Sequence, residues 1–380
     1  MSESPVGGSA GVPAILVQLD FGEGGYAERL DEFRLLASSA GTSAKSLLQG
    51  KRHAPDAATY AGKGKVEEIA VAVRQHLAEI VIFNHELSAG QQRNLENALA
   101  CRVIDRSALI LDIFAQRAKT HEGKLQVELA QLQHLATRLV RGWTHLERQK
   151  GGIGLRGPGE KQLETDRRLL GKRVSLLKES LKQLERQRAV RRRARTRGDM
   201  LSVSLVGYTN AGKTTLFNAL TKAGSYAADQ LFATLDTTSR RLFLGAEGQI
   251  VISDTVGFIR DLPHALVAAF HATLEETAGS NLLLHVVDSA SPDRDQQVAA
   301  VNRVLTEIGA AAVPQIIVWN KIDSTAASPG VERDEYAKIC RVRLSARSGA
   351  GLDLLRATLT EVMREHASRN QAEVPADAAF

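Results

Sequence analysis

The sequence predicts an α/β protein in which two α/β domains are separated by an antiparallel helical hairpin. Three observations lead to this fold class. Short apolar runs alternate with helical patterns in residues 14–115 and again in residues 199–368. Leucines recur every three or four residues over two long stretches between these parts. A glycine-rich loop joins a predicted strand to a predicted helix in the C-terminal part, which is typical of a doubly wound nucleotide-binding domain.

The composition excludes several other classes of protein. Hydrophobic residues make up 43% of the chain and charged residues 24%, which excludes a wholly disordered or fibrous protein. No apolar run approaches the ~18 to 20 residues that a membrane-spanning helix needs, so we expect no membrane span. Two distant cysteines, Cys101 and Cys340, are too few for a disulfide framework. We therefore expect a cytoplasmic protein and leave partial association with a membrane open.

The charge is concentrated in the middle of the chain. The whole sequence carries a net charge of +6, but residues 116–198 alone carry +14, whereas residues 1–115 carry −3 and residues 199–368 carry −4. Such a segment favours a polyanionic partner. The predicted parts are a disordered N-terminus (1–13), an N-terminal α/β domain (14–115), a basic helical hairpin with a glycine-rich loop (116–198), a nucleotide-binding domain (199–368) and a tail (369–380).

The N-terminal domain is predicted to be a largely parallel sheet, because its strands and helices alternate. We expect strands at 15–19, 80–83 and 103–104, and helices at 26–40, 65–76, 88–99 and from about 105 to 117. Ser88 is the expected cap of the third helix.

The middle segment is predicted to form two long helices with narrow apolar seams. The seams consist of Leu125, Leu129, Leu132, Ala136, Leu139, Trp143 and Leu146 in the first helix, and Leu170, Val174, Leu177, Leu181 and Leu184 in the second. The loop at 151–159 contains five glycines, and it is longer than the ~2 to 5 residues that a helix pair requires. The second helix ends in a cluster of basic residues, Arg186, Arg188, Arg191, Arg192, Arg193, Arg195 and Arg197.

The C-terminal domain has the pattern of a doubly wound sheet. Its predicted strands are 202–206, 250–253, 282–287, 315–319 and 342–344, and its predicted helices are 214–221, 298–308 and 352–365.

The first of these strands runs into residues 207–214, which fit the phosphate-binding motif G-x-x-x-x-G-K-[ST]. Glycines let backbone N–H groups point at phosphate oxygens, and the following helix presents its positive end to them. Lys213 can reach the β and γ phosphates, and the hydroxyl of Thr214 can bind Mg²⁺.

Three further elements follow strands of the same domain. Residues 254–257 (Asp-Thr-Val-Gly) place a carboxylate that can hold Mg²⁺ through water and a Gly257 N–H that can meet the γ-phosphate. Residues 320–323 (Asn-Lys-Ile-Asp) supply Asp323, which can accept hydrogen bonds from N1 and N2 of guanine, groups that adenine lacks. Lys321 can pack over the base, and the backbone of residues 345–347 can meet guanine O6. Together these elements resemble the Ras-like superfamily of P-loop GTPases, with GTP as substrate.

A switch-one segment needs a threonine that binds Mg²⁺ when the γ-phosphate is present. Residues 232–238 contain three candidates, and we prefer Thr234 to Thr237 and Thr238. We assign Lys213, Thr234 and Gly257 to catalysis, and Thr214 and Thr234 to Mg²⁺. The predicted nucleotide-binding residues are Gly207, Tyr208, Thr209, Asn210, Ala211, Gly212, Lys213, Thr214, Phe232, Ala233, Thr234, Leu235, Asp236, Asp254, Thr255, Val256, Gly257, Asn320, Lys321, Ile322, Asp323, Ser345, Ala346 and Arg347.

One position departs from Ras. Phe258 occupies the place of the glutamine that orients water in Ras, so slow intrinsic hydrolysis and an activating partner are expected. No arginine finger can be assigned: Arg240, Arg241 and Arg260 are near the switches, but solvated or partner-facing roles are expected for them.

Roughly residues 14 to 367 resemble the HflX family of GTPases. The matching segments are 232–236, 254–259 and 262–263 in the GTPase domain, the glycine-rich signature at 156–164, and residues 62–65, 105–106 and 111–114 of the N-terminal domain. There are small departures: Arg347 stands where many relatives have lysine, and residues 237–239 lack a proline that is common there.

The resemblance implies a ribosome-associated GTPase that binds the large ribosomal subunit and separates stalled or idle ribosomes, especially after heat stress. The basic hairpin would then contact rRNA, with salt-sensitive affinity, and the protein would be a monomer off the ribosome. Two alternatives are a large-subunit assembly GTPase and a signalling switch with a protein effector. A second nucleotide site at residues 62–65, which would bind ATP, is a weaker hypothesis.

Overall fold

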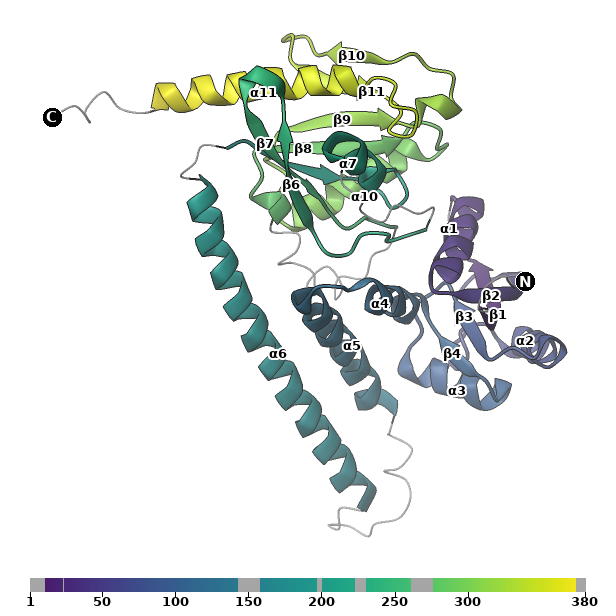
Figure 1. The fold of residues 1–380 in the computed structure, drawn as a ribbon. Coiled ribbons are helices and arrows are strands. Elements are labelled where there is room, and N and C mark those ends of the chain that lie inside the picture. Colours follow the sequence, from purple (N-terminus) through teal and green to yellow (C-terminus); the bar gives the residue numbers. More distant parts are fainter. Residues whose placement is uncertain are drawn as a thin grey trace, which may run out of the picture. The chain divides into compact units, whose positions relative to one another are not determined.

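The computed structural model describes residues 11–22, 24–142, 158–196, 200–222, 230–260 and 276–373. The chain divides into two compact units. Unit 1 comprises Met1–Gln116 and Val127–Lys178, and unit 2 comprises Arg117–Gln126 and Glu179–Phe380. The predicted α/β class is confirmed, because each unit contains a mainly parallel sheet with helices packed on it (Figure 1).

Unit 1 contains a parallel four-stranded sheet in the order β2-β1-β3-β4. Its strands are β1 (Val12–Asp20), β2 (Thr42–Lys51), β3 (Ile80–Phe83) and β4 (Arg102–Ile104). Its helices are α1 (Tyr26–Ser39), α2 (Lys63–His76), α3 (Ala89–Leu99) and α4 (Arg106–Arg117, whose last residue belongs to unit 2). Alternate residues of β1 join Val81 and Phe83 in a core that Ile69 and Leu95 cover.

Two local features of unit 1, the N-terminal cap of α3 and the first residue of β1, can be compared with the sequence-based predictions. Ser88 caps α3 as expected: its hydroxyl accepts from Gln91 N at 3.2 Å, and Gln91 Oε1 accepts from Ser88 N at 2.9 Å. Strand β1 begins at Val12, so Val12 and Pro13 belong to the sheet instead of a disordered N-terminus. Residues 1–10 lie outside the described residues.

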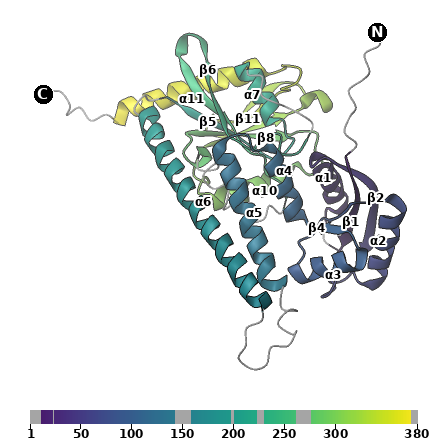
Figure 2. The ribbon, with the colours of Figure 1, turned by 60° about the horizontal axis from the view of Figure 1, so that its bottom comes forward.

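The hairpin helices are α5 (His121–Gly142) and α6 (Pro158–Thr196), which lie side by side (Figures 1 and 2). Leu129 and Leu177 of the predicted seams are buried, and Arg173 Nε donates to Glu128 Oε1 at 2.7 Å. Helix α6 begins at Pro158, so Pro158 and Gly159 belong to the helix and not to the predicted loop. Proline suits a first helical turn because its missing N–H would have no helical partner there. Trp143, Leu146 and residues 151–157 lie outside the described residues.

Unit 2 contains a seven-stranded sheet in the order β10-β11-β9-β8-β5-β7-β6 among the residues described. The strands are β5 (Ser202–Val206), β6 (Thr238–Phe243), β7 (Gln249–Asp254), β8 (Leu282–Asp288), β9 (Gln315–Asn320), β10 (Gly330–Arg333) and β11 (Ile339–Arg343). Only the end strands β6 and β10 pair antiparallel within this described sheet. Because β5 lies between β7 and β8, the loop after β5 sits where the strand order reverses, which is the ligand-binding position of such sheets.

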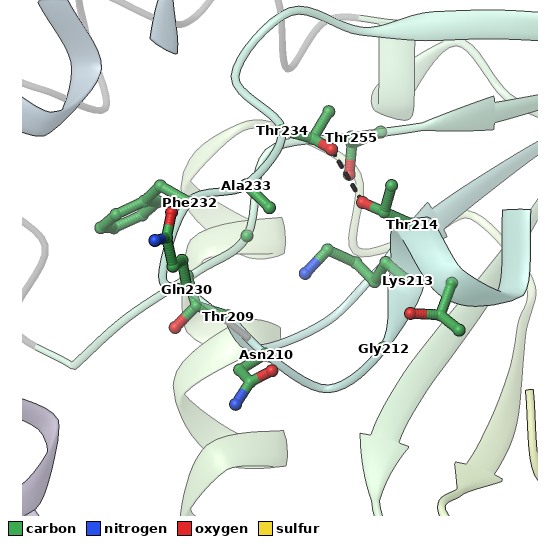
Figure 3. A pocket seen from close by; sticks show the side chains of 12 residues that line it. Thr209, Asn210, Gly212, Lys213, Thr214, Gln230, Phe232, Ala233, Thr234 and Thr255 are labelled. Atoms are coloured by element: carbon green, nitrogen blue, oxygen red, sulfur yellow. Dashed lines mark hydrogen bonds between the residues drawn. The ribbon is translucent and has the colours of Figure 1, made fainter. Parts of the chain in front are cut away.

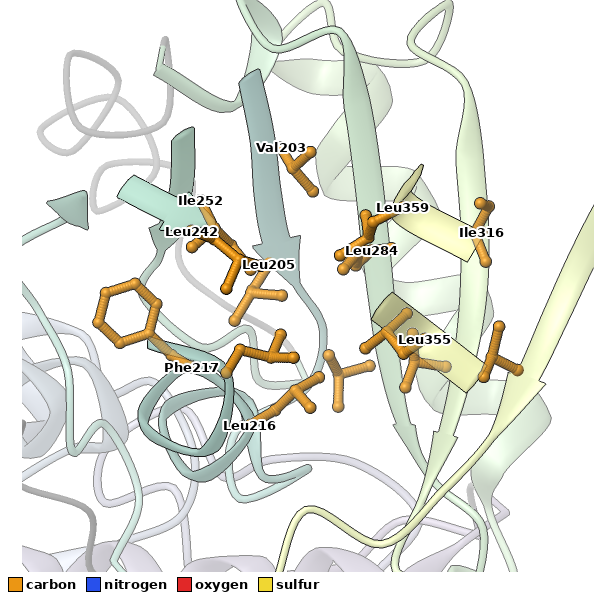
Figure 4. Close-up of a cluster of buried hydrophobic side chains, with 14 of the residues drawn as sticks. Val203, Leu205, Leu216, Phe217, Leu242, Ile252, Leu284, Ile316, Leu355 and Leu359 are labelled. Atoms are coloured by element: carbon orange, nitrogen blue, oxygen red, sulfur yellow. The ribbon is translucent and has the colours of Figure 1, made fainter. Parts of the chain in front are cut away.

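Helices α7 (Lys213–Thr221), α10 (Arg294–Glu307) and α11 (Leu352–Glu373) pack on this sheet, and two short 3₁₀ turns are η2 (Gly245–Glu247) and η3 (Ile322–Ser324). Figure 4 shows Leu216 and Phe217 of α7 in one cluster with Leu205 of β5, and all three are fully buried. This packing fixes the first turn of α7, and therefore Lys213 and Thr214, against the end of β5.

The main predicted strands and helices are present, with shifts at their ends, whereas the edge strands β2, β6 and β10 were not predicted. β2 and β6 carry polar or basic residues and no apolar run, since an edge strand needs only partial burial. None of the described helices is both long and apolar enough to cross a membrane.

Candidate nucleotide-binding site

The loop between β5 and α7 has the backbone shape that an anion needs. Gly207 (φ 147°), Asn210 (φ 61°) and Gly212 (φ 95°) adopt positive φ. A Cβ at Gly207 would lie 2.2 Å from Val286 O, and one at Gly212 would lie 2.2 Å from Asn320 Nδ2. Both glycines are therefore required by conformation and by space. The loop is also tied to the segment after β7, because Thr209 N donates to Phe258 O at 2.7 Å.

Lys213 is a buried cation with its ammonium group inside this loop. Its Nζ donates to Gly207 O at 3.0 Å and to Tyr208 O at 2.8 Å. Burial lowers the pKa of Lys213 to about 8, and the nearby Asp254 carboxylate opposes that shift. A buried ammonium whose hydrogen bonds to the described residues go to neutral carbonyl oxygens is the arrangement that a phosphate group would stabilise.

Three oxygen atoms from separate segments meet beside Lys213. Thr214 Oγ1 lies 2.7 Å from Thr234 Oγ1 and 2.8 Å from Asp254 Oδ2, and Thr234 Oγ1 donates to the same Asp254 oxygen at 2.9 Å. Figure 3 shows Thr214 and Thr234 facing each other at the pocket. Burial raises the pKa of Asp254, and hydrogen bonds from the two threonines and the charge of Lys213 oppose this.

This oxygen cluster fits Mg²⁺. Neighbouring ligands of an octahedral Mg²⁺ are about 2.9 Å apart, since the metal–oxygen distance is about 2.0 to 2.1 Å. Asp254 Oδ1 and Thr209 Oγ1 are buried without a hydrogen-bond partner among the described residues. Two orphaned oxygens beside a buried lysine are unfavourable by themselves, and a bound metal and phosphate would satisfy them.

The segment after β7 packs closely against the phosphate loop at Gly257, which lines the pocket. A Cβ at Gly257 would lie 2.7 Å from Thr209 Cγ2 and 3.0 Å from Lys213 Nζ. Thr255 lines the pocket, but its hydroxyl donates to Leu205 O at 2.6 Å, so it also fastens the segment to β5. Phe258 is buried in the core with 1% of its surface exposed, and it carries no group that could orient water.

The predicted switch-one residues separate into two groups. Phe232, Ala233 and Thr234 line the pocket, together with Gln230 and Thr215, which no sequence motif indicates as nucleotide-binding residues. Leu235 and Asp236 do not line it, and neither does Val256 of the segment after β7. Leu235 is buried, and the carboxylate of Asp236 instead accepts hydrogen bonds from Lys119 N and Thr120 N at 2.8 and 2.9 Å.

The remaining motifs lie at the carboxyl ends of β9 and β11. Asn320 connects them to the phosphate loop: its Nδ2 donates to Ala211 O and its Oδ1 accepts from Ala346 N, both at 2.9 Å. Lys321 has a positive φ of 64°, and its Nζ donates to Asp288 Oδ2 at 2.8 Å. Asp323 is exposed in the middle of the turn η3, while Ile322, the first residue of that turn, is buried.

The last predicted element, residues 345–347, forms a turn that is closed by Ser348 N donating to Ser345 Oγ at 3.1 Å. Arg347 is exposed. Two contacts were missed at the sequence level: Asp288 as the partner of Lys321, which its place at the end of β8 could have suggested, and the Lys119–Thr120 partner of Asp236, which no local pattern marks. Arg260 is not a solvated charge, since it pairs with Asp293 at 2.9 Å and both side chains are mostly buried.

A phosphate loop at the reversal of a doubly wound sheet, a Thr–Thr–Asp oxygen cluster and a base-side Asn–Lys–Ile–Asp turn together define a P-loop GTPase domain. Family models agree along the chain. Residues 27–115 match "GTP-binding GTPase N-terminal", residues 117–195 match "GTP-binding GTPase Middle Region", and residues 202–321 match "50S ribosome-binding GTPase".

The chain belongs to the HflX GTPase family. It is 56% identical over 367 residues to GTPase HflX of Escherichia coli (strain K12), covering 96% of this chain and 86% of that relative. It is 48% identical over 349 residues to GTPase HflX of Magnetococcus marinus, covering 91% and 80%. The family and the GTPase activity predicted from the sequence are thus confirmed.

A solved structure shares the fold. The crystal structure of a GTP-binding protein from the archaeon Sulfolobus solfataricus in complex with GDP is similar with a TM-score of 0.50 at 22% identity, and the match covers 93% of this chain and 99% of that one.

Proposed function

We propose that this GTPase binds Mg²⁺ and GTP in the pocket of unit 2, associates in the cytoplasm with the rRNA of the large ribosomal subunit, and separates stalled or idle ribosomes, particularly under stress. The large subunit is proposed as partner because the GTPase domain matches a model described as a 50S ribosome-binding GTPase. The +14 charge of residues 116–198 supports it, since such a segment supplies affinity for RNA phosphates. Off the ribosome we expect a monomer.

The roles of the site residues follow from their positions. Lys213 and the N–H groups of residues 207–214 would hold the phosphates, and Thr214 and Thr234 would bind Mg²⁺, with Asp254 behind them. Gly257, which lines the pocket and lies close to Thr209 and Lys213, would meet the γ-phosphate through its N–H. Asn320, Lys321 and Asp323, with residues 345–347, would select guanine. The bound Mg²⁺ would neutralise charge that develops on the phosphates.

The observation that carries the ribosome-activation part is the burial of Phe258. A phenyl ring in the core cannot orient the attacking water, so efficient hydrolysis requires a group from a partner or a rearrangement that a partner induces. The large subunit would supply this stimulus, and relaxation of switch one after hydrolysis would then end the association.

The test is GTP hydrolysis with and without purified large subunits over a series of salt concentrations. We expect strong stimulation that falls steeply as salt rises. Asp323→Asn removes the acceptor pair for guanine N1 and N2 and should abolish the stimulated GTPase rate, which serves as the control for base selectivity. An absence of stimulation at every salt concentration would contradict the proposed activator. A splitting assay on intact ribosomes then separates ribosome splitting from a role in subunit assembly.

A further inference from the structure

Switch one is held from outside the nucleotide pocket by the start of helix α5. Asp236 Oδ2 accepts from Lys119 N at 2.8 Å and from Thr120 N at 2.9 Å, and Asp236 Oδ1 accepts from Thr120 Oγ1 at 2.5 Å. All of these residues belong to unit 2. We call this set of hydrogen bonds the Asp236 clamp. A carboxylate that accepts two N–H groups at a helix N-terminus is favoured by its hydrogen bonds and by the helix dipole.

The helix start is shaped to receive this carboxylate. Thr120 is the residue before α5, and its hydroxyl accepts from Gly123 N at 2.9 Å while it donates to Asp236. Gly123 is buried, and a Cβ built on it would lie 2.1 Å from Asp236 Oδ1. Only glycine allows so close an approach. The contact is therefore a built part of the fold and not a chance meeting of two surface groups.

The clamp lies only two residues from the proposed Mg²⁺ ligand of switch one. The hydroxyl of Thr234 is hydrogen-bonded to Thr214 and Asp254, and Leu235, between Thr234 and Asp236, is 2% exposed. On the other side, β6 begins at Thr238, which pairs with Asp254 in the sheet. Switch one is thus fixed at its pocket end by Thr234 and at its outer face by Asp236, so release of the carboxylate would free the segment that carries Thr234.

The same helix is also anchored in unit 1. Residues 121–126 of α5 belong to unit 2 and the rest to unit 1. There, Arg138 forms an ion pair with Asp105, whose side chain is 2% exposed. Asp105 is itself held, since its Oδ1 accepts from Ala108 N at 2.9 Å. One continuous helix therefore joins the clamp to a buried ion pair of the N-terminal domain.

We propose that Asp236 is a positioning residue that holds Thr234 in its Mg²⁺-binding place only while the start of α5 grips it, so that closure of the GTP site and the setting of the helical hairpin are one coupled equilibrium. GTP uses Thr234 through Mg²⁺ and GDP does not, so GTP favours the clamped state. By linkage, the clamped state favours GTP to the same degree. The inference rests on the proposed nucleotide site and adds to it the means by which hairpin and nucleotide state communicate.

The test measures the affinities of a non-hydrolysable GTP analogue and of GDP, with Mg²⁺, for the full chain and for the Asp236→Ala and Gly123→Ala variants. We expect each variant to weaken analogue binding at least about tenfold, as loss of charge-assisted hydrogen bonds predicts, while GDP affinity changes less than about threefold. In a Thr234→Ala background, Asp236→Ala should not weaken binding of the analogue further, because Asp236 acts on analogue binding only through Thr234.

Two control variants match these changes elsewhere in the chain. Asp334 accepts from the N–H groups of Tyr336 and Lys338, both at 2.9 Å, in an exposed turn, so Asp334→Ala removes a similar carboxylate away from the switch. Gly90 lies in the first turn of α3, where a Cβ would meet only Ser88 Oγ at 4.0 Å. Asp334→Ala and Gly90→Ala should leave both affinities unchanged.

The outcomes separate the clamp from the site itself. If both test variants bind the two nucleotides with the same ratio of analogue affinity to GDP affinity as the unaltered chain, the clamp alone is overturned. If the unaltered chain binds neither nucleotide, both proposals are overturned. Amide exchange on the unaltered chain gives a check that needs no variant. The N–H groups of Lys119 and Thr120 should exchange more slowly with the analogue than with GDP, and equal exchange would contradict the clamp.

Discussion

The phosphate loop and switch one line the same pocket but are held in place by different kinds of structure. Residues 207–214 are fixed by three positive-φ positions, Gly207, Asn210 and Gly212, and by the packing of α7 on β5. Switch one instead depends on a contact with residues that are 116 and 117 positions earlier in the chain. The loop is therefore suited to bind phosphate in every nucleotide state, whereas switch one can report the state to a distant part of the chain.

The largest effect on nucleotide affinity should come from a change in the phosphate loop. Lys213→Ala removes the buried cation of the phosphate loop, so affinity for both GTP and GDP should fall by about a hundredfold or more. Titration with a fluorescent guanine nucleotide measures this. Lys338→Ala, which removes an exposed lysine between β10 and β11, is the control and should bind normally. Equal nucleotide affinities for Lys213→Ala and the unaltered chain would contradict the proposed role of the phosphate loop in nucleotide binding.

A smaller and more selective effect is expected at Gly257. In Gly257→Ala, the new Cβ would lie 2.7 Å from Thr209 Cγ2 and 3.0 Å from Lys213 Nζ. It would displace Gly257 or Lys213 where the γ-phosphate is proposed to bind, so we expect about a tenfold loss of affinity for the GTP analogue and little loss for GDP. Gly171→Ala provides the control, because a Cβ at Gly171 meets nothing within 4 Å. Equal losses for both nucleotides would indicate general damage to the loop.

The smallest effect is a pH dependence of binding. Burial lowers the pKa of Lys213 to about 8, and bound phosphate would raise it again by its negative charge. At pH values near and above 8, nucleotide binding should therefore be accompanied by proton uptake at Lys213. The affinity for nucleotide should fall about fourfold between pH 7 and pH 8.5. Calorimetry in buffers of different ionisation enthalpy counts these protons. Binding that is independent of pH over this range, without proton uptake, would show that the ammonium is already stabilised in the free protein.

The difference between the phosphate loop, which is fixed locally, and switch one, which is held by a distant contact, also explains which features could be predicted from the sequence. The phosphate loop, Asp254 and Asn320 each follow an apolar strand, so their places at one edge of the sheet follow from the α/β pattern. Thr234, the preferred switch-one threonine, has its hydroxyl oxygen 2.7 Å from that of Thr214, and its role in Mg²⁺ binding stays a prediction.

The partner of Asp236 could not be predicted, because nothing near it in sequence indicates that Lys119 and Thr120 lie beside it. The edge strand β2 was missed for a related reason. Its polar sequence is extended because β1 supplies its hydrogen-bond partners, and not because of an apolar run of its own. The glycines on both sides of Pro158 predict a loop there, but Pro158 begins α6, because proline is also a common first residue of a helix.

In the proposed function, the GTP-bound site controls association with the large ribosomal subunit. Co-sedimentation of the unaltered chain with purified large subunits, in the presence of a non-hydrolysable GTP analogue or of GDP at moderate salt, measures this directly. We expect strong association with the analogue and weak association with GDP. Equal association in the two states, or none in either, would contradict this proposal.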